Sequence, residues 1–564
     1  MKDIKPKADI LIEVSYEIVS KLGGIHTVIK TKAPFMKEHY GKGYMVVGLY
    51  TKRDAKKKFR KKEPNKELKA LFQELKKEKV ICHYGTWDAK SHPIAILIDV
   101  KKLKRDKKTK NKIMEDYWVH FLPKDDYHNN SLLFGYSAGR LIAKLMKLSD
   151  FKKKKVVVNA HEYMSGLTLL YLRKHKSNLP LVFTTHATSL GRAIAFQGEN
   201  LQKEMLKHKK KDKIAYSKKL RSYRKKVGEV LFNRHLFEKA CAKKADVFTT
   251  VSETTSSEAG FILDNKADVV TPNGLDIVNP PSIEEQLALN YKAKQKICKF
   301  MQAYFSPYYK LDSKNCLLFY TAGRNEVYTK GYDLFFEALR KLNKKLKKEK
   351  YEKNIFVLLF IIVLGKKEIK KEVVKALNGR LKKPSSKHPP NCLFKARENV
   401  INLYLKKNKL FNKQSDKVKI LFYPAPVKKT DKLLSMHYKE IISGMDLGIF
   451  PSLYEPWGYT PLETAAMSTV PITTDVAGFG RFIDKITDQR KNPGIIVLKT
   501  KNREREKIIG RLAETMHEIA HMPKEKRIVN RVKANKLASL ANWQDFSKYY
   551  VKAHNMALKK HKKR

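Results

Sequence analysis

The sequence predicts an α/β protein made of two doubly wound parallel sheets. Short runs of β-branched and aliphatic residues alternate with helical patterns, and this alternation occurs twice along the chain, as expected of parallel sheets covered by helices. Most of these runs end in a polar side chain. At 564 residues the chain exceeds the size of a single core, so we expect at least two domains.

The composition is that of a folded protein with a strong positive charge. Hydrophobic residues make up 42% and aromatic residues 10%, and 119 Lys and Arg against 56 Asp and Glu give a net charge of +63. The basic runs are spread between apolar segments, without zinc-finger, RNP or basic-zipper spacing. We therefore expect weak, salt-sensitive adhesion to nucleic acid and no specific binding; specific binding driven by charge is the alternative.

Cysteine use and hydropathy indicate a cytoplasmic protein. The five cysteines form no CxxC pair, which favours free thiols over disulfides or a structural zinc site. The N-terminus lacks the apolar core and cleavage site of a signal peptide. The longest apolar run, residues 355–364, is too short to span a bilayer and predicts a buried parallel strand, so we expect no membrane partner.

The first alternating series predicts one sheet-forming domain. Its strand candidates are residues 10–14, 44–48, 81–84, 94–100, 156–159, 181–185, 247–251 and 269–271, with a charged helical excursion over 52–80. The carboxyl ends of parallel strands meet at one edge of a sheet. Polar side chains follow the last four runs at this edge, namely His161, His186, Arg192, Ser252 and Asn273. One histidine at a strand end is usually structural, but four such strand ends favour a site.

A second feature of this edge is the Gly23-Gly24 pair between the first strand and a helix starting near residue 25. Glycines allow the backbone to approach a ligand closely, although ordinary turns use them as well. Lys21 beside them favours a phosphate.

The second alternating series predicts another sheet. Its strand candidates are residues 317–321, 355–364, 418–423, 446–450, 470–474 and 494–498, followed by three helical patterns. We place the domains at residues 1–278 and 279–542, with a Lys-rich insertion at about 366–415. Arg324 and Lys330 follow the strand at 317–321, six residues apart and beside a glycine. They suit a diphosphate, which Arg engages bidentately and Lys as a point charge; the alternative is a pair of solvated charges.

The stretch FPSLYEPWGYTPLET, residues 450–464, places Glu455 and Glu463 on either side of Gly458. Thr460 suits the N-cap of a helix, and Glu463 would complete a capping box three residues later. Capping explains Glu463 but gives Glu455 no role. A helix N-terminus with free N–H groups is also an anion site, so the stretch predicts a phosphate-bearing ligand.

Seven separated blocks, in order from about residue 10 to 558, resemble eukaryotic-type glycogen synthase of glycosyltransferase family 3. They are ILIEVSYEIVSKLGGIHTVIKTKA, VFTTHATSLGR, VFTTVSETT, VVTPNGLD, YTAGRNEVYTKGYDLFFEALRKLN, FPSLYEPWGYTPLET and NWQDFSKYYVKAHNMAL. The resemblance implies the GT-B fold, with two Rossmann-like domains facing an interdomain cleft. Residues 1–278 would form the acceptor-side domain, residues 279–542 would bind the nucleotide sugar, and the C-terminal helix at 543–564 would return to the first domain.

The resemblance implies a retaining UDP-glucose:glycogen 4-α-glucosyltransferase (the activity of EC 2.4.1.11), which adds glucose to the non-reducing end of an α-1,4-glucan. No cofactor is implied beyond UDP-glucose as co-substrate. No metal is expected either. Other glycosyltransferases bind a metal through a DxD motif, and here no two aspartates are separated by a single residue. The implied partners are glycogen or another α-1,4-glucan and further copies of the chain, in a homo-oligomer of unknown order. The alternatives are a GT-B transferase using ADP-glucose or another acceptor, and a non-catalytic glucan-binding scaffold.

Carried over by position, the resemblance also assigns residue roles. Glu455 would lie by the donor glucose, His186 would hydrogen-bond it, and Arg324 and Lys330 would clamp the diphosphate; these four form the catalytic set. Glu463 would hold the ribose and Tyr438 would stack on uracil. The remaining substrate-binding residues are Lys21, Gly23, Gly24, His161, Arg192, Asn273, Trp457, Gly458, Tyr459 and Thr460.

Two departures from the family bear on the nucleotide base and on regulation. A second aromatic residue near the uracil is replaced by Pro426. In animal and fungal members an arginine-rich helix senses glucose 6-phosphate. The corresponding segment here is residues 524–536, and it has a reversed charge at Glu525. This reversal argues against sugar-phosphate activation.

Overall fold

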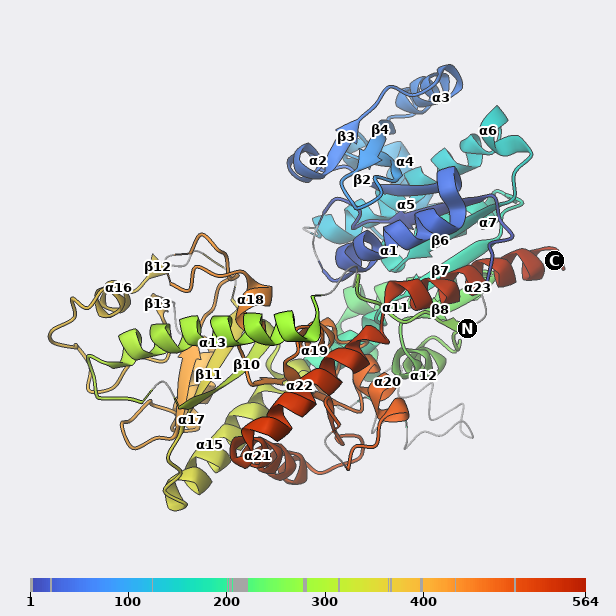
Figure 1. The fold of residues 1–564 in the computed structure, drawn as a ribbon. Helices are drawn as coiled ribbons and strands as arrows, with labels where there is room; N and C mark the ends of the chain where they lie inside the picture. Colours follow the sequence, from blue (N-terminus) through green and yellow to red (C-terminus); the bar gives the residue numbers. More distant parts are fainter. Residues whose placement is uncertain are drawn as a thin grey trace. The chain divides into compact units, whose positions relative to one another are not determined.

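The computed structural model describes residues 4–563 except for 21–22, 124, 200, 202–204, 206–221, 277–280, 313–314, 364, 366–367, 396–398, 432 and 491–492. The chain divides into two compact units (Figure 1). Unit 1 comprises Met1–Ile194, Glu204–Asp276 and Ala541–Arg564, and unit 2 comprises Ala195–Lys203 and Ile277–Leu540. Each unit holds one large sheet covered by helices, which confirms the predicted fold class.

The sheet of unit 1 has nine strands in the order β3-β4-β5-β2-β1-β6-β7-β8-β9. Apart from the antiparallel β3 and β4, all strands are parallel to their neighbours. Strands β2 and β5 follow β1 on one side and β6 to β9 on the other, so the strand order reverses between β1 and β6. The bounds are β1 (Ile10–Ser15), β2 (Tyr44–Leu49), β3 (Phe59–Lys61), β4 (Ile81–Trp87), β5 (Ile94–Asp99), β6 (Val156–His161), β7 (Leu181–Thr185), β8 (Val247–Thr250) and β9 (Val269–Val270).

Helices connect and cover these strands. They include the predicted helical excursion, which contains two helices separated by β3. The bounds are α1 (Ile25–Tyr40), α2 (Lys52–Lys58), α3 (Lys66–Lys77), α4 (Lys107–Tyr117), α5 (Asp126–Leu145), α6 (Ser149–Lys152), α7 (Tyr163–Lys174), α8 (Ser189–Phe196), α11 (Glu229–Lys244), α12 (Glu253–Ile262) and α23 (Trp543–His561).

The C-terminal helix α23 packs beside α1 (Figure 1), as the sequence predicts. Trp543 donates its indole N–H to Thr31 Oγ1 at 2.8 Å. The ammonium group of Lys32 lies 3.7 Å from the ring centroid of Tyr550, a cation–π contact. Gly274 packs against the backbone of Trp543 so closely that a Cβ would collide with it. These contacts tie the last helix to the core of unit 1.

The sheet of unit 2 has six parallel strands in the order β14-β11-β10-β15-β16-β17. The order reverses between β10 and β15. In open α/β sheets ligands bind at the carboxyl ends of the strands that flank such a reversal. The bounds are β10 (Cys316–Arg324), β11 (Asn354–Ile362), β14 (Val418–Phe422), β15 (Leu447–Ile449), β16 (Val470–Thr474) and β17 (Ile496–Leu498). A separate antiparallel pair consists of β12 (Glu368–Ile369) and β13 (Phe394–Lys395).

The helices of unit 2 are α13 (Ile283–Phe305), α14 (Val327–Lys330), α15 (Tyr332–Lys348), α16 (Lys371–Leu377), α17 (Val400–Lys407), α18 (Tyr438–Ser443), α19 (Tyr459–Ala466), α20 (Gly478–Ile486), α21 (Arg505–His521) and α22 (Lys524–Ser539). In the Lys-rich segment at 366–415, Phe394, Ile401 and Leu405 join the same core as β11. This segment is thus the packed crossover between β11 and β14. In the parts of the chain that the structure describes, every helix is too short or too polar to cross a membrane.

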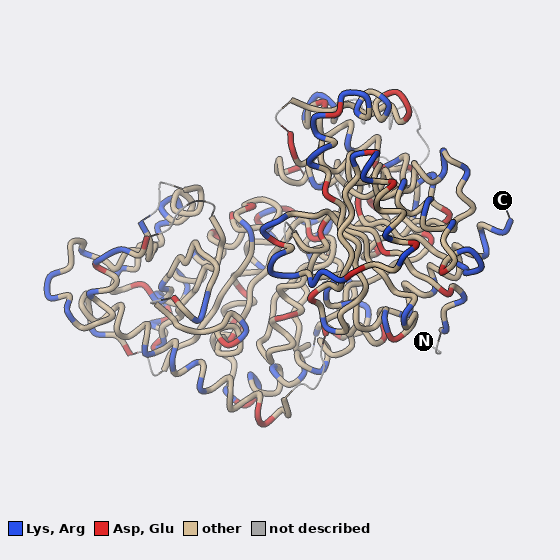
Figure 2. Tube along the Cα trace, turned by 90° about the horizontal axis from the view of Figure 1, so that it is seen from above, with Lys and Arg blue, Asp and Glu red and all other residues tan. Residues whose placement is uncertain are grey.

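Lys and Arg occur along nearly the whole trace of both units (Figure 2). They lie mainly on helices and connecting segments, interspersed with Asp and Glu. The predicted spread of positive charge is confirmed.

Candidate active site

Two cationic side chains follow β10 at the strand reversal of unit 2. The strand continues three residues beyond its predicted end, so Arg324 is its last residue. The guanidinium group is 56% exposed and lies 3.1 Å from the carboxylate of Glu326. Lys330 closes the short helix α14 that follows. Its ammonium group forms an ion pair with Glu455, and the two side chains are only 14% and 18% exposed. The structure thus brings together two of the predicted catalytic residues.

The loop that carries Glu455 is fastened to α14 by main-chain contacts. The amides of Leu453 and Tyr454 donate to the carbonyl oxygen of Thr329 at 2.9 and 3.1 Å. Gly331 adopts φ 65° next to Pro451, and a Cβ there would collide with the Pro451 carbonyl oxygen. Glycine is required at this position both by the backbone angle and by the close approach.

The start of α19 corrects the predicted capping box. The helix begins at Tyr459 with Gly458 as its N-cap, so Thr460 is the second helical residue and Glu463 the fifth. Gly458 has φ 113°, a conformation that glycine adopts without strain, and this turn starts the helix two residues earlier than a Thr460 cap would. Since glycine supplies no side-chain cap, the first-turn amides of α19 are suited to an anionic ligand.

Glu463 and Tyr438 lie near one another. Tyr438 is half-buried, and burial, the nearby Tyr320 and the charge of Glu463 raise its pKa well above the ordinary value. A hydrogen bond with Tyr320 contributes to this rise. Pro426, where the family has a second aromatic residue, is exposed on the loop after β14.

Trp457 lies in an aromatic cluster. Its indole is 4% exposed, and its ring centroid lies 6.0 Å from that of Phe479. Its carbonyl oxygen accepts a hydrogen bond from the Phe479 amide at 2.8 Å, and that of Glu455 accepts one from Gly478 at 3.1 Å. These contacts hold the loop 455–458 against the start of α20. Tyr459, next in the chain, is half-buried.

In unit 1, His161 and His186 end adjacent strands and contact each other. His161 Nδ1 lies 2.9 Å from His186 Nε2. On its other side, His161 Nε2 lies 2.6 Å from Glu13 Oε1. Glu13 also forms an ion pair with Lys32 and accepts a hydrogen bond from the Tyr44 hydroxyl at 2.5 Å. Glu13, Lys32, His161 and Tyr44 are fully buried or nearly so.

This network determines the protonation of the two histidines. Burial lowers the pKa of both His161 and His186. Burial alone would raise the pKa of Glu13, but Lys32 and His161 outweigh it and hold that pKa well below its ordinary value. Asn159 Nδ2 also lies 2.9 Å from His161 Nε2, but the ionised Glu13 is closer and charged, so we assign Nε2 as its donor and Nδ1 as the acceptor of His186 Nε2–H. We therefore assign a neutral His186 whose Nδ1 is an acceptor.

Glu162 positions the backbone of His186 and was not recognised from the sequence. Its Oε1 accepts hydrogen bonds from the amides of His186 and Ala187 at 2.7 and 3.1 Å. Its own backbone has φ 64° and ψ 164°, which is strained for any residue except glycine. Burial raises its pKa to about 7.

Two further buried glutamates hold the same segment from other helices. Glu238 of α11 accepts from the Ser189 amide at 2.8 Å, and Glu258 of α12 accepts from the Thr188 hydroxyl. Burial and the neighbouring Glu162 raise the pKa of Glu238 well above its ordinary value. The three glutamates are widely separated in sequence and share no local pattern, so sequence reasoning had no signal for them.

The other predicted residues of unit 1 have varied surroundings. Arg192 is exposed on α8, and its charge opposes the raised pKa of Glu162. Asn273 is buried, and its Oδ1 has no partner among the described residues. Ser252 caps α12, since its hydroxyl accepts from the Thr255 amide at 3.1 Å. Ser252 is therefore explained by helix structure.

The Gly23-Gly24 turn precedes α1 in unit 1. The Gly23 amide donates to Glu17 Oε2 at 2.8 Å. Gly24 is the N-cap of α1, and a Cβ added there would meet no atom within 4 Å. The fold itself therefore does not require glycine at Gly24, and the phosphate turn stays a prediction. Lys21 lies outside the described residues.

The helix α22, where the resemblance places a sugar-phosphate sensor, holds Arg531, whose side chain is only 12% exposed. Arg531 donates to the carbonyl oxygens of Ser468, Ser443 and Met445 at 2.9, 3.0 and 2.6 Å. It fastens α22 to the strands β15 and β16, and these contacts use its guanidinium group within the fold.

A family model described as Glycogen synthase matches residues 13–389 and 370–563. The chain is 28% identical over 611 residues to "Glycogen [starch] synthase" of Neurospora crassa, covering 98% of this chain and 84% of that protein. It is 28% identical over 627 residues to "Glycogen [starch] synthase isoform 1" of Saccharomyces cerevisiae, covering 98% of this chain and 86% of that protein. For the liver protein of Mus musculus the identity is 28% over 608 residues, with 98% and 84% covered.

Among solved structures, the chain is similar to the catalytic domain of Starch Synthase IV from Arabidopsis thaliana, with a TM-score of 0.53, 15% identity and coverage of 97% and 99%. It is also similar to an alpha,alpha-trehalose-phosphate synthase from Burkholderia vietnamiensis, with a TM-score of 0.52, 11% identity and coverage of 96% and 99%. At such identities the likeness shows the fold alone, which is GT-B with two Rossmann-like parallel-sheet domains. The family match extends over nearly the whole chain, across both sheets and the returning helix α23, and from it we conclude that this chain belongs to the glycogen synthase family.

Proposed function

We propose that the chain transfers glucose from UDP-glucose to the non-reducing 4-OH of an α-1,4-glucan, with retention of the anomeric configuration. The observation that carries the proposal is the Lys330–Glu455 ion pair at the strand reversal of unit 2, with Arg324 at the end of the adjacent strand. This is the position at which doubly wound sheets bind nucleotides. Family membership supports the donor and the acceptor.

The cations of unit 2 suit the leaving group. Departure of UDP builds negative charge on the diphosphate, which Arg324, Lys330 and the first-turn amides of α19 would neutralise. A diphosphate that engages Lys330 would loosen its pair with Glu455. The carboxylate of Glu455 would then be available to the oxocarbenium-like carbon of the departing glucose. The acceptor hydroxyl would attack from the face that UDP leaves and pass its proton to the leaving phosphate oxygen.

The neutral His186 suits a sugar hydroxyl. With Nδ1 as an acceptor, it would receive a hydrogen bond from the donor glucose, and the chain through His161 to Glu13 would keep this tautomer. At the nucleotide end, the ring of Tyr438 would stack on uracil and Glu463 would accept from the ribose hydroxyls. The reaction as proposed uses no metal.

The decisive experiment is incorporation of radiolabelled glucose into glycogen from UDP-glucose, compared with ADP-glucose, with and without glucose 6-phosphate and chelator. We expect turnover with UDP-glucose that survives chelator. Faster turnover with ADP-glucose would contradict the donor assignment. Unchanged activity in Arg324→Ala and Glu455→Ala would exclude the proposed catalytic set, and absence of transfer with retained glycogen binding would favour a scaffold.

We also propose that the enzyme acts in the cytoplasm as a homo-oligomer. The resemblance to eukaryotic-type glycogen synthase supports both, and the five cysteines are free thiols. Light scattering of the purified chain measures the oligomer, and a monomer at micromolar concentration would contradict it. Imaging of the tagged chain in cells tests the compartment.

A further inference from the structure

The C-terminal end of α21 carries a histidine spacing that the proposed reaction does not use. Residues 517–521 have the sequence HEIAH, so His517 and His521 lie four residues apart on one face of the helix. Their ring centroids are 4.2 Å apart. Two imidazoles with this spacing on a helix are a recurrent chelating pair for zinc.

A carboxylate from a neighbouring helix lies against both imidazoles. Glu349, the C-cap of α15, has its Oε2 2.8 Å from His517 Nε2 and 3.6 Å from His521 Nε2. In a tetrahedral zinc site with bonds of about 2.0–2.1 Å, ligand atoms are roughly 3.3–3.4 Å apart. The two observed distances lie on either side of this value, and the candidate ligand atoms of the three residues all lie within 4.8 Å of one another.

The surroundings of His521 orient its ring for coordination. His521 Nδ1 lies 3.0 Å from the carbonyl oxygen of His517. A carbonyl oxygen only accepts, so Nδ1 carries the proton and the Nε2 lone pair faces Glu349. Tyr351 packs its ring against His521, with centroids 4.8 Å apart, and donates its hydroxyl to the Ala520 carbonyl at 2.6 Å. Such outer contacts are typical of metal-binding histidines.

We propose that Glu349, His517 and His521 form a binding site for Zn²⁺ or a closely related divalent transition ion. The side chains are 35%, 17% and 43% exposed, so the ion enters from solvent and water completes its coordination. The role is structural, because the ion would join the C-terminal ends of α15 and α21. In hydrolytic zinc sites of this spacing the intervening glutamate acts as a base, whereas here Glu518 lies 2.9 Å from Arg511 in an ion pair.

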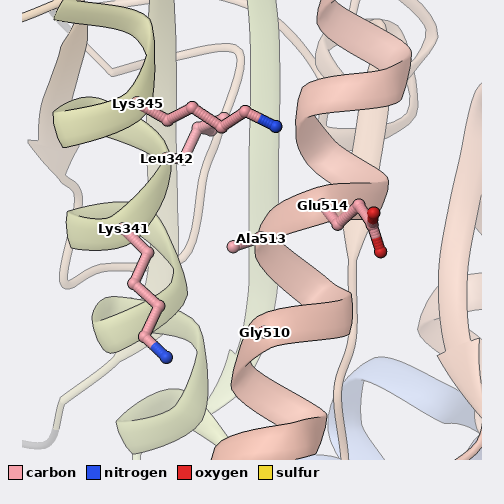
Figure 3. Close-up of a pocket in the computed structure, with 6 residues that line it drawn as sticks. All are labelled: Lys341, Leu342, Lys345, Gly510, Ala513 and Glu514. Carbon is pink, nitrogen blue, oxygen red and sulfur yellow. The ribbon is translucent and has the colours of Figure 1, made fainter. Parts of the chain in front are cut away.

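The same two helices, α15 and α21, border a groove (Figure 3). The groove has a volume of about 260 Å³ and is lined by Lys341, Leu342, Lys345, Gly510, Ala513 and Glu514. Figure 3 shows Lys341 and Lys345 on α15 and Glu514 on α21. The exposed border of this helix pair is polar, and Lys341 reaches Glu506 there at 3.1 Å. A metal ion would add a link at the C-terminal ends of the two helices, beside the apolar core that they share.

The test is Zn²⁺ titration of the chelator-treated full chain by calorimetry, with thermal melting and the visible absorption of bound Co²⁺. We expect one ion per chain and a higher melting temperature. Glu349→Gln and His521→Ala should each weaken binding by more than about 100-fold, because even outer-contact changes cost 10–100-fold. The exposed His120→Ala is the matched control and should bind as the wild type.

Unchanged affinity in Glu349→Gln or in His521→Ala would overturn the proposal, as would a wild-type chain that binds no ion at micromolar Zn²⁺. Thermal melting without metal checks that the variants fold. If His521→Ala does not fold, His521→Asn replaces it. Chelator should lower the melting temperature of the protein. The initial rate of glucose transfer, measured well below that temperature, should not change. Failure of this site is therefore distinguishable from failure of the proposed function.

Discussion

The two sheets of this chain each have a reversal of strand order, but they hold the polar residues there in opposite ways. At the strand reversal of unit 1, Glu13, His161 and His186 are buried and bonded to one another. At the reversal of unit 2, Arg324 is exposed and Lys330 pairs with Glu455 at the edge of solvent. Unit 1 is preorganised around neutral imidazoles, which suit uncharged sugar hydroxyls. Unit 2 presents cations paired with carboxylates, and in the proposed reaction a diphosphate would take the place of these partners.

The largest effect is expected from removing the Glu13 charge at the centre of the buried network of unit 1. Glu13→Gln leaves Lys32 charged and without its ion-pair partner in a fully buried site. We expect it to lower the free energy of unfolding by about 3–5 kcal/mol, measured by chemical denaturation. Glu368→Gln, which removes an exposed pair with Lys395 at 3.2 Å, is the control and should change stability by less than about 1 kcal/mol. Equal effects would contradict the contrast between the sites.

The corresponding change in unit 2 should affect activity more than stability. Lys330→Ala removes a cation from the proposed diphosphate site, and kcat for glucose transfer should fall by about 10²–10³-fold. The melting temperature should fall less than in Glu13→Gln, because this pair is 14% and 18% exposed whereas the Glu13–Lys32 pair is fully buried. Lys499→Ala, which breaks the Asp484 pair of the same unit, should retain full activity. A large loss of stability with unchanged kcat in Lys330→Ala would reverse the assignment.

The free energy of unfolding should depend on pH through the buried Glu162 of unit 1. Burial raises the pKa of Glu162 to about 7 from 4.5, so between these values the folded state binds more protons there than the unfolded state. Its contribution to the free energy of unfolding therefore falls as the pH rises from about 4.5 to 7, by on the order of 1–3 kcal/mol. Glu162→Gln should flatten this part of the stability profile. An unchanged slope would show that Glu162 ionises normally.

The smallest expected effect is at the proposed uracil contact. Tyr438→Ala should raise the KM for UDP-glucose about tenfold and leave kcat nearly unchanged, because base stacking contributes about 1–3 kcal/mol. Tyr291, exposed on α13, is the control, and its change to Ala should leave both constants unaltered. A lower kcat at unchanged KM in Tyr438→Ala would argue against the stacking role.

Local patterns in the sequence predicted most of the fold. A parallel strand covered on both faces is a run of apolar and β-branched residues, so β10, β11 and most other strands could be placed from the chain alone. Strand ends also indicated the candidates His161, His186 and Arg324. The start of α19 was misplaced, because Thr460 suits an N-cap by local propensity while the turn at Gly458 is determined by the loop docked on α14 and α20.

The sequence by itself therefore determined the two sheets, their order along the chain and the residues at the strand ends. Only the tertiary structure decided how those residues are paired. Glu13 and His161 are 148 positions apart, Lys330 and Glu455 are 125 apart, and Glu349 and His517 are 168 apart. Hydrophobic periodicity records which face of an element is buried, but the partner of a buried charge depends on which strands and helices pack together.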